Sequence, residues 1–593
     1  MKKNILILGV FLLGMSGCSL DYENKEAITP DNVWTDKTMI NGFLNDIYGR
    51  MSPGWPIDAN NTDEGMNGPT SLNDFARGNY TVELQGQKLD YGNIDRINFF
   101  LNKLDNEVTV LTEEEKNALK GQALFWRAWD YFGKVNTVGG VPLILEVQDI
   151  TDVSSLFVSR NSTSECMAQI IKDLDEAISY LPDAYEDKEY GRIDKGTAMA
   201  FKGRVQLFYA SPMFNPNNDA TRWETAYNTN KAAVEYLTAH GKGLYKGNFA
   251  DIWYDEQNCE VIMVNQFYYP DHAFDQKNIR PEPLTRDGAN DNQAILSLLM
   301  AYPKADGTPL ELDIDRLSDP AYNQQFMTDF YTNRDPRFQA TIFCPGTVYP
   351  CTNAQVEGGQ RYWNAWYEQE VDGKIQMNSL IDYQIGTTVG GGMSGYFQKK
   401  GLDESLNNAS VYQAETDWIE IRFAEVLMNY GECANEIGKS TEALDVLYQI
   451  RERAGIVNTT GNYGITATTQ ADIREAYVNE RFIEFAYEGK RWNDLRRWKR
   501  FDILNDLKYR SSLYAVINDK ADAENFDFTK DMSDPEIRKM FHFVYIKNVD
   551  QDDTYKFNLD DKYVFYPIHK DVIDQNSKIE QNIAWGGTFD PLK

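Results

Sequence analysis

The chain has 593 residues, of which 42% are hydrophobic and 25% charged, a balance that excludes a disordered chain, a collagen-like chain and a small disulfide-rich protein. Asp and Glu outnumber Lys and Arg by 90 to 59, which gives a net charge of −31. Because so acidic a protein repels phosphate backbones, we expect no nucleic-acid partner.

The N-terminus has the pattern of a secretory signal. Lys2 and Lys3 precede a short apolar run over residues 5–13, and small residues then lead to Cys18. The run is shorter than the roughly 20 apolar residues that a membrane-spanning helix needs. We therefore predict a signal peptide over residues 1–17 that resembles a bacterial lipoprotein signal, with Cys18 as the acylated anchor. An ordinary signal peptide with an incidental cysteine is the alternative.

Long amphipathic patterns predict that helices dominate the chain. In chain order they cover residues 31–51, 91–106, 112–135, 164–181, 195–209, 223–240, 418–437, 440–454, 469–487 and 490–501. Thr112 and the three glutamates after it predict a helix start, and Gly139, Gly140 and Pro142 predict where that helix stops. The helix pairs resemble degenerate tetratricopeptide repeats, whose stacking gives a rigid scaffold. An unrelated helical bundle is the alternative.

Between residues 240 and 418 the sequence changes character. Glycine-rich and aromatic segments alternate with short β-like runs at residues 261–264 and 340–343. No low-complexity linker divides the chain, so we interpret residues 18–593 as a single unit. It has an N-terminal helical region to about residue 240, a loop-rich elaboration over about 241–416, and C-terminal helix pairs and a tail from about 417. The predicted fold is mainly α, with the irregular elaboration mounted on the scaffold.

Five segments in order along the chain resemble the SusD/RagB family of outer-membrane nutrient-binding lipoproteins. They lie at residues 122–143, 191–212, 422–455, 479–498 and 565–582. The tail departs from the family pattern at His569-Lys570 and at Ile583-Ala584. The resemblance implies a SusD-like fold and a non-catalytic protein that captures an oligosaccharide or polysaccharide at the cell surface. It also implies delivery of that glycan to a TonB-dependent, SusC-like transporter in the outer membrane.

The segment at residues 479–498 combines arginines with carboxylates. Arg481, Arg491, Arg496 and Arg497 alternate with Glu480, Glu484, Glu488 and Asp494. Because the carboxylates are close enough in sequence to match these donors, we predict a structural network of ion pairs. A binding site for an anion or a sugar acid is the alternative.

Glycan recognition needs flat aromatic faces and converging polar side chains. Three clusters have this composition, and we predict ligand contacts for Trp55, Asn73, Arg77, Tyr80, Arg286, Asp287, Tyr362, Trp363 and Trp366. The alternatives are a polar surface loop at residues 55–80, a turn at 285–292 and a helix core at 363–366. The resemblance implies ligand contact through loops in the N-terminal region and the elaboration, without assigning single positions.

The remaining chemistry is sparse. Cys344 and Cys351 flank a turn-rich loop and are candidates for a disulfide. Cys166, Cys259 and Cys433 lie in apolar-rich segments and are predicted to be core residues. Neither a nucleophile elbow, nor a zinc-protease helix, nor a phosphate loop occurs in the sequence, so we expect no enzyme, no cofactor and no metal centre. A bound calcium ion has no nameable site. Two alternatives stay open: a lipid-anchored glycoside hydrolase, and a helix-repeat scaffold that binds protein alone.

Overall fold

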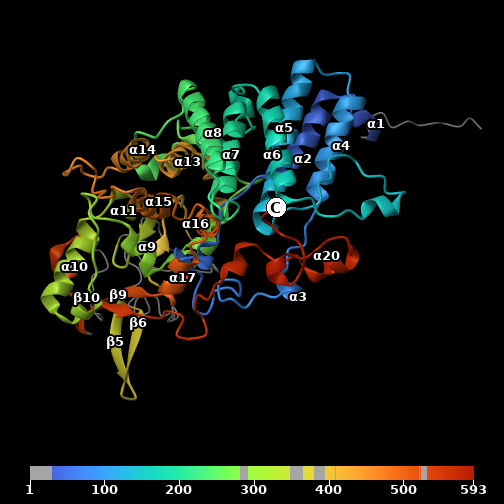
Figure 1. Ribbon diagram of the computed structural model, residues 1–593. Coiled ribbons are helices and arrows are strands. Elements are labelled where there is room, and N and C mark those ends of the chain that lie inside the picture. Colours follow the sequence, from blue (N-terminus) through green and yellow to red (C-terminus); the bar gives the residue numbers. More distant parts are fainter. Residues whose placement is uncertain are drawn as a thin grey trace, which may run out of the picture.

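Helices account for most of the regular structure of the computed structural model, which describes residues 30–280, 291–347, 365–379, 394–407, 409–519, 521–522 and 531–593. Nine of the longer helices are α2 (Lys37–Met51), α4 (Gly92–Asn106), α5 (Glu113–Val138), α6 (Thr163–Tyr180), α7 (Lys195–Ala210), α8 (Ala220–Ala239), α13 (Phe423–Glu436), α14 (Ser440–Arg453) and α15 (Gln470–Glu484). Figure 1 shows most of them side by side, with the strands and loops below. Packing follows the order α5, α6, α7, α8 and α13, and α13 then contacts both α14 and α15.

Shorter helices lie around this array. They are α1 (Pro30–Val33), α3 (Val82–Gln85), α9 (Leu296–Ala301), α10 (Pro320–Thr332), α11 (Pro336–Thr341), α16 (Arg491–Trp498), α17 (Phe501–Leu507), α19 (Pro535–Arg538) and α20 (Lys570–Gln575). The end of the chain returns to the array, where the Ser164 backbone amide of α6 donates to the Lys593 carbonyl at 3.0 Å (Figure 1). The tail is therefore fixed against the N-terminal helices.

Most of the predicted helices are present. The one predicted over residues 490–501 is divided, because α16 ends at Trp498 and α17 begins at Phe501, and two further predictions differ at their starts. The sequence predicts one helix over residues 31–51, but α1 ends at Val33 and α2 starts anew after Asp36, whose carboxylate accepts from the Met39 backbone amide. Residues 418–422, predicted to be helical, form strand β8 instead. In contrast, Thr112 caps α5 as predicted, in a reciprocal capping box with Glu115.

Ten short strands complete the described fold. They are β1 (Gly65–Met66), β2 (Val261–Asn265), β3 (Gln293–Ala294), β4 (Ile342–Phe343), β5 (Trp366–Val371), β6 (Lys374–Ser379), β7 (Phe397–Gln398), β8 (Trp418–Arg422), β9 (Ser512–Ile517) and β10 (Phe541–Ile546). They form sheets in the orders β10-β9-β5-β6 and β1-β3-β7-β4, and a β2-β8 ribbon. The β5–β6 hairpin extends away from the rest of the molecule (Figure 1).

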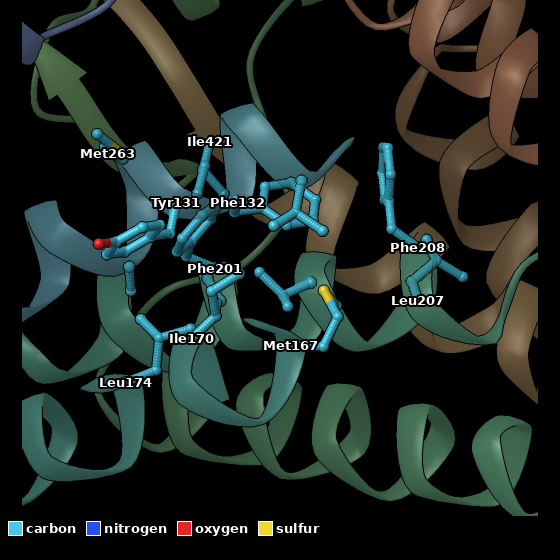
Figure 2. Close-up of a cluster of buried hydrophobic side chains, with 14 of the residues drawn as sticks. Tyr131, Phe132, Met167, Ile170, Leu174, Phe201, Leu207, Phe208, Met263 and Ile421 are labelled. Carbon is cyan, nitrogen blue, oxygen red and sulfur yellow. The ribbon is translucent and has the colours of Figure 1, made fainter. Parts of the chain in front are cut away.

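A continuous apolar core joins the array to the β2–β8 ribbon. Figure 2 shows part of it, made of Tyr131, Phe132, Met167, Ile170, Leu174, Phe201, Leu207, Phe208, Met263 and Ile421. These side chains come from α5, α6, α7 and the two strands of the ribbon. Because each buried ring or aliphatic chain contributes about 1.5–3 kcal/mol, this contact holds the elaboration firmly on the scaffold.

Buried ion pairs make a second joint between the scaffold and the elaboration. Arg422 lies 2.7 Å from Glu260 and 2.8 Å from Glu488, and all three side chains are almost fully buried. The arginines of residues 479–498 are likewise held inside the protein, in the pairs Arg481–Asp494 (2.8 Å), Arg491–Asp63 (2.6 Å) and Arg497–Glu432 (2.5 Å). Arg496 donates to the Val564 carbonyl at 2.8 Å. The predicted structural ion network is confirmed, although Asp63 and Glu432 are distant in sequence and Arg496 binds backbone carbonyls in place of a carboxylate.

Candidate functional site

An open groove lies where the loop after α2 meets the C-terminal tail. It encloses about 600 Å³, and its lining contains Asn73, Arg77, Tyr80, Tyr555 and Tyr566. We call it the tyrosine groove. Three of its residues were predicted from the sequence as ligand contacts, and the structure brings these three together although the loop has little regular structure of its own. Its size is within the range of about 300–1,000 Å³ that is usual for ligand sites.

Arg77 is the basic group of the tyrosine groove. Its guanidinium carbon lies 4.0 Å from the centroid of the Tyr555 ring, and Nη1 lies 3.3 Å from an oxygen of Asp74. The other Asp74 oxygen accepts from Gln85 Nε2 at 3.0 Å. The aromatic ring and the carboxylate therefore hold the guanidinium in place, and its five N–H donors exceed what these contacts use.

Tyr80 and Tyr566 belong to one packed aromatic group. Tyr566 stacks on Phe75 with centroids 4.1 Å apart, and Tyr80 meets the same Phe75 edge-on at 4.8 Å. The Trp492 indole donates to the Tyr566 hydroxyl at 3.0 Å. Burial raises the pKa of Tyr80 to about 12, so its hydroxyl keeps its proton at neutral pH and both donates and accepts hydrogen bonds.

Asn73 shapes the loop that carries these residues. Its side-chain oxygen accepts from the Ala76 backbone amide at 2.9 Å, and its amide nitrogen donates to Asn61. The Arg77 backbone amide donates to the Asn73 carbonyl at 3.1 Å. Both ends of the Asn73 side chain are thus occupied by the turn, which places Arg77 and Tyr80 in the groove.

Trp55 and Trp366 lie away from the tyrosine groove. Trp55 is 8% exposed, its indole donates to the Thr416 carbonyl at 2.9 Å, and its ring stacks on Phe274. Trp366 is 4% exposed at the start of β5 and stacks on Tyr514 with centroids 3.8 Å apart. Both rings are packed inside the protein and lie outside the site proposed below.

The predicted lipid anchor and the other predicted ligand contacts lie outside the described residues. These are Cys18, Arg286, Asp287, Tyr362 and Trp363, and their predicted roles stay predictions. The predicted disulfide also stays a prediction, because Cys351 is outside the described residues. Its partner Cys344 is buried, and burial raises the pKa of that thiol to about 12.

The sequence reading missed several tyrosines that the structure exposes. Tyr268, Tyr269 and Tyr412 are each about half exposed, and the rings of Tyr269 and Tyr412 lie 6.3 Å apart. They are spread over 145 residues of sequence with no motif. Tyr555 was also missed, because it follows an acidic stretch of the tail that resembles ordinary surface. Tyr566, by contrast, lies in the segment at 565–582 that carries the family resemblance.

Two classes of feature are missing from the part of the chain that the structure describes. There, no three or more His, Cys, Asp or Glu side chains are grouped closely enough to ligate a metal ion. No described helix combines the length and the apolar character needed to cross a membrane.

Comparison with known proteins gives a consistent family. Residues 252–585 match the model of the SusD family, and residues 27–207 match a model described as starch-binding associating with outer membrane. SusD-like protein P2 of Formosa agariphila is 24% identical over 534 residues, which cover 84% of this chain and 91% of the relative. SusD-like protein P38 of the same organism is 22% identical over 437 residues, or 72% and 75% of the two chains.

Solved structures show the same fold. A SusD-like protein from Bacteroides fragilis superposes with a TM-score of 0.70 at 24% identity, over 94% of this chain and 98% of that one. A laminarin-binding SusD-like protein gives a TM-score of 0.55 at 20% identity, over 93% and 99%. These likenesses confirm the predicted mainly α, SusD-like fold.

Proposed function

Because this chain belongs to the SusD family, we propose that it binds an oligosaccharide or polysaccharide at the outer membrane and cleaves no bond in it. Two comparisons support this function. One family model is described as starch-binding and as associating with the outer membrane, and one structural neighbour is described as binding laminarin. Starch and laminarin are both glycans, so these descriptions point to one ligand class.

The tyrosine groove is the proposed contact site, and its convergence of Arg77 with tyrosine rings is the observation that carries the proposal. A sugar ring packs its C–H face on an aromatic side chain, and its hydroxyls bind planar polar groups. Arg77 offers unused N–H donors beside the Tyr555 ring, and the protonated Tyr80 hydroxyl offers a second polar contact. Since the groove is open, a chain of sugars can extend beyond it in either direction.

The proposal has two further parts, anchoring and delivery. We infer that Cys18 is acylated and tethers the protein to the outer membrane, since residues 1–18 have the lipoprotein signal pattern. We also infer that the bound glycan passes to a TonB-dependent, SusC-like transporter, as the family resemblance implies. Labelling with a radioactive or clickable palmitate analogue tests the anchor, because Cys18→Ser abolishes the label. Co-purification from detergent-solubilised outer membranes tests the partner.

Titration calorimetry against starch, laminarin and other glycans tests the binding function. We expect heat with at least one glycan, and we expect Arg77→Ala and Tyr80→Ala each to weaken that binding about tenfold, the loss of about 1.4 kcal/mol. Arg316→Ala is the matched control, because Arg316 also lies over a tyrosine ring, 4.3 Å from the Tyr322 centroid, but far along the chain on the elaboration.

Three outcomes contradict the proposal. If the wild-type protein gives no heat with any glycan, the binding function is wrong and a protein-binding scaffold gains support. If reducing ends accumulate during long incubation with the bound glycan, the protein is a hydrolase. If Arg316→Ala weakens binding as much as Arg77→Ala does, the tyrosine groove is not the contact site.

A further inference from the structure

A second, more enclosed cavity lies inside the scaffold and has no part in the proposed function. It holds about 320 Å³ between α5, α7, α16 and the loop at residues 53–58. We call it the Trp129 cavity after the half-buried tryptophan on its wall. Gly54 and Gly133 are exposed and also line it, so its mouth includes two residues without side chains. Its volume is at the lower end for ligand sites and suits a molecule with one ring.

One wall of the Trp129 cavity is aromatic. The Trp129 and Phe201 rings have centroids 4.6 Å apart, and Phe132 meets Phe201 edge-on at 5.6 Å. Phe208 continues the wall, with its centroid 5.5 Å from that of Phe132. Figure 2 shows these three phenylalanines on α5 and α7, at the edge of the core. The wall therefore offers ring faces to a ligand and is anchored from behind by packed side chains.

The lining of the cavity also carries charged side chains, and nearly all of them are already paired. Three bases line the cavity, and each is held by carboxylates: Arg204 by Glu425 (2.6 Å) and Glu420 (2.7 Å), Lys490 by Glu420 (3.2 Å) and Glu425 (3.4 Å), and Arg481 by Asp494 (2.8 Å). Glu488, also on the lining, is bound by Arg422 and Lys400 at 2.8 Å each. These pairs leave no spare positive charge to attract an anion.

Asp58 is the exception among these charged lining residues. Among the described residues it has neither an ion pair nor a hydrogen bond to its carboxylate from another side chain. Burial raises the pKa of Asp58, although the charge of the nearby Lys490 acts in the opposite direction. Asp58 is only partly buried and forms no ion pair within the described residues, so a cation bound in the cavity can make a charge-assisted contact with its carboxylate.

We propose that the Trp129 cavity binds a small organic ammonium ion that carries one ring. The ring lies against Trp129 and the phenylalanines, and the ammonium group meets the Asp58 carboxylate. Ammonium groups gain from aromatic faces as well as from charge-assisted hydrogen bonds to carboxylates, so the rings and the Asp58 carboxylate favour the same ligand. A neutral ring of the same size leaves Asp58 without a counter-charge. The site is separate from the tyrosine groove and does not depend on glycan binding.

The test compares ring compounds that differ only in their charged group. Calorimetry on the full chain at neutral pH uses cyclohexylamine against cyclohexanol and glucosamine against glucose. We expect at least one amine to bind about tenfold more tightly than its hydroxyl counterpart. Binding by cyclohexylamine alone assigns a hydrocarbon ring, and binding by glucosamine alone assigns an amino sugar; both support the proposal. Equal affinity within both pairs, or no binding of either amine, overturns it.

Three variants locate the site. Asp58→Asn removes the charge and keeps the shape, so the ratio of amine affinity to hydroxyl affinity falls to about one. Asp315→Asn is the control: it removes an exposed carboxylate on the elaboration and leaves this ratio unchanged. Gly133→Phe adds a ring at the mouth, where no atom lies within 4 Å of the new Cβ, and blocks entry. If Asp58→Asn folds with an unchanged melting temperature and retains the preference, the cavity is not the site.

Discussion

Glu64 shows how a single buried group couples this fold to pH. It is 2% exposed, its carboxylate accepts from the Tyr487 backbone amide at 3.1 Å and from the Thr62 hydroxyl at 3.2 Å, and it has no ion pair among the described residues. Burial, reinforced by the nearby charge of Asp58, raises the pKa of Glu64 to about 8. The folded protein thus keeps a proton that the unfolded chain releases near pH 4.5.

This pKa shift predicts the direction in which Glu64→Gln changes the free energy of unfolding at each pH. Between pH 4.5 and 8 the folded state binds more protons than the unfolded state, so the contribution of Glu64 to stability falls as the pH rises. Glutamine stays neutral, and we expect the variant to match the wild type at pH 5 and to exceed it at pH 8 by about 4 kcal/mol. Urea unfolding at both pH values measures the difference. Glu224→Gln, at an exposed position of α8, is the control, and an equal gain there contradicts the assignment.

Single residues differ in how far the sequence predicts their roles. Arg77 and Tyr80 stand in a turn-rich segment with few apolar neighbours, so their placement on a surface loop follows from local composition. Whether a tryptophan faces a sugar or the core depends on distant residues. Trp55 is enclosed by Phe274 and Trp418, which come more than 200 residues later, and no local pattern signals that contact.

At the scale of elements, α5 depends on its N-terminal cap. The Thr112 hydroxyl accepts from the Glu115 backbone amide at 3.2 Å, and the Glu115 carboxylate accepts from the Thr112 amide at 2.8 Å. We expect Thr112→Ala to lower the free energy of unfolding by about 1 kcal/mol, because the Glu115 backbone amide loses the hydroxyl that caps it. Thr225→Ala, at an exposed position within α8, is the control and has little effect. Chemical denaturation followed by circular dichroism checks both, and equal losses contradict the capping role.

The elements also differ in how well the local sequence predicts their secondary structure. Helices such as α5 and α6 are predicted because their caps and apolar periodicity lie within the helix itself. β8 is different: Ile419 and Ile421 also fit a helical pattern, and the residues become a strand because they pair with Val264 and Met263 of β2. That partner lies more than 150 residues earlier, so the strand is decided by tertiary packing.

At the scale of the molecule, the resemblance of five segments predicts the overall fold, whereas the groove depends on how the chain ends meet. The loop at residues 70–85 and the tail at 555–566 are almost 500 residues apart. Tyr566 and Phe75 stack only because the tail packs back onto the N-terminal helices. Each of the two segments contains some residues of the site, but neither contains a motif that predicts the complete site.

The charge of the whole molecule predicts which glycans it accepts. Arg77 and Asp74 are the charged residues on the groove lining and contact each other, so the site is neutral within a chain of net charge −31. A uronic or sulfated glycan is therefore repelled by the body of the protein without a compensating base in the groove. This repulsion acts over about 10 Å at 0.1 M salt and only about 3 Å at 1 M.

We therefore expect laminarin to bind more tightly than sulfated laminarin at low salt. Raising the salt concentration from 0.05 M to 0.5 M strengthens binding of the sulfated polymer, because the repulsion is screened, and leaves binding of the neutral polymer nearly unchanged. Calorimetric titration of both polymers at the two salt concentrations measures this. Where laminarin itself does not bind, the neutral glycan identified by the panel and its sulfated form replace it. Tighter binding of the sulfated form, weakened by salt, contradicts the expectation and indicates a basic contact surface elsewhere on the chain.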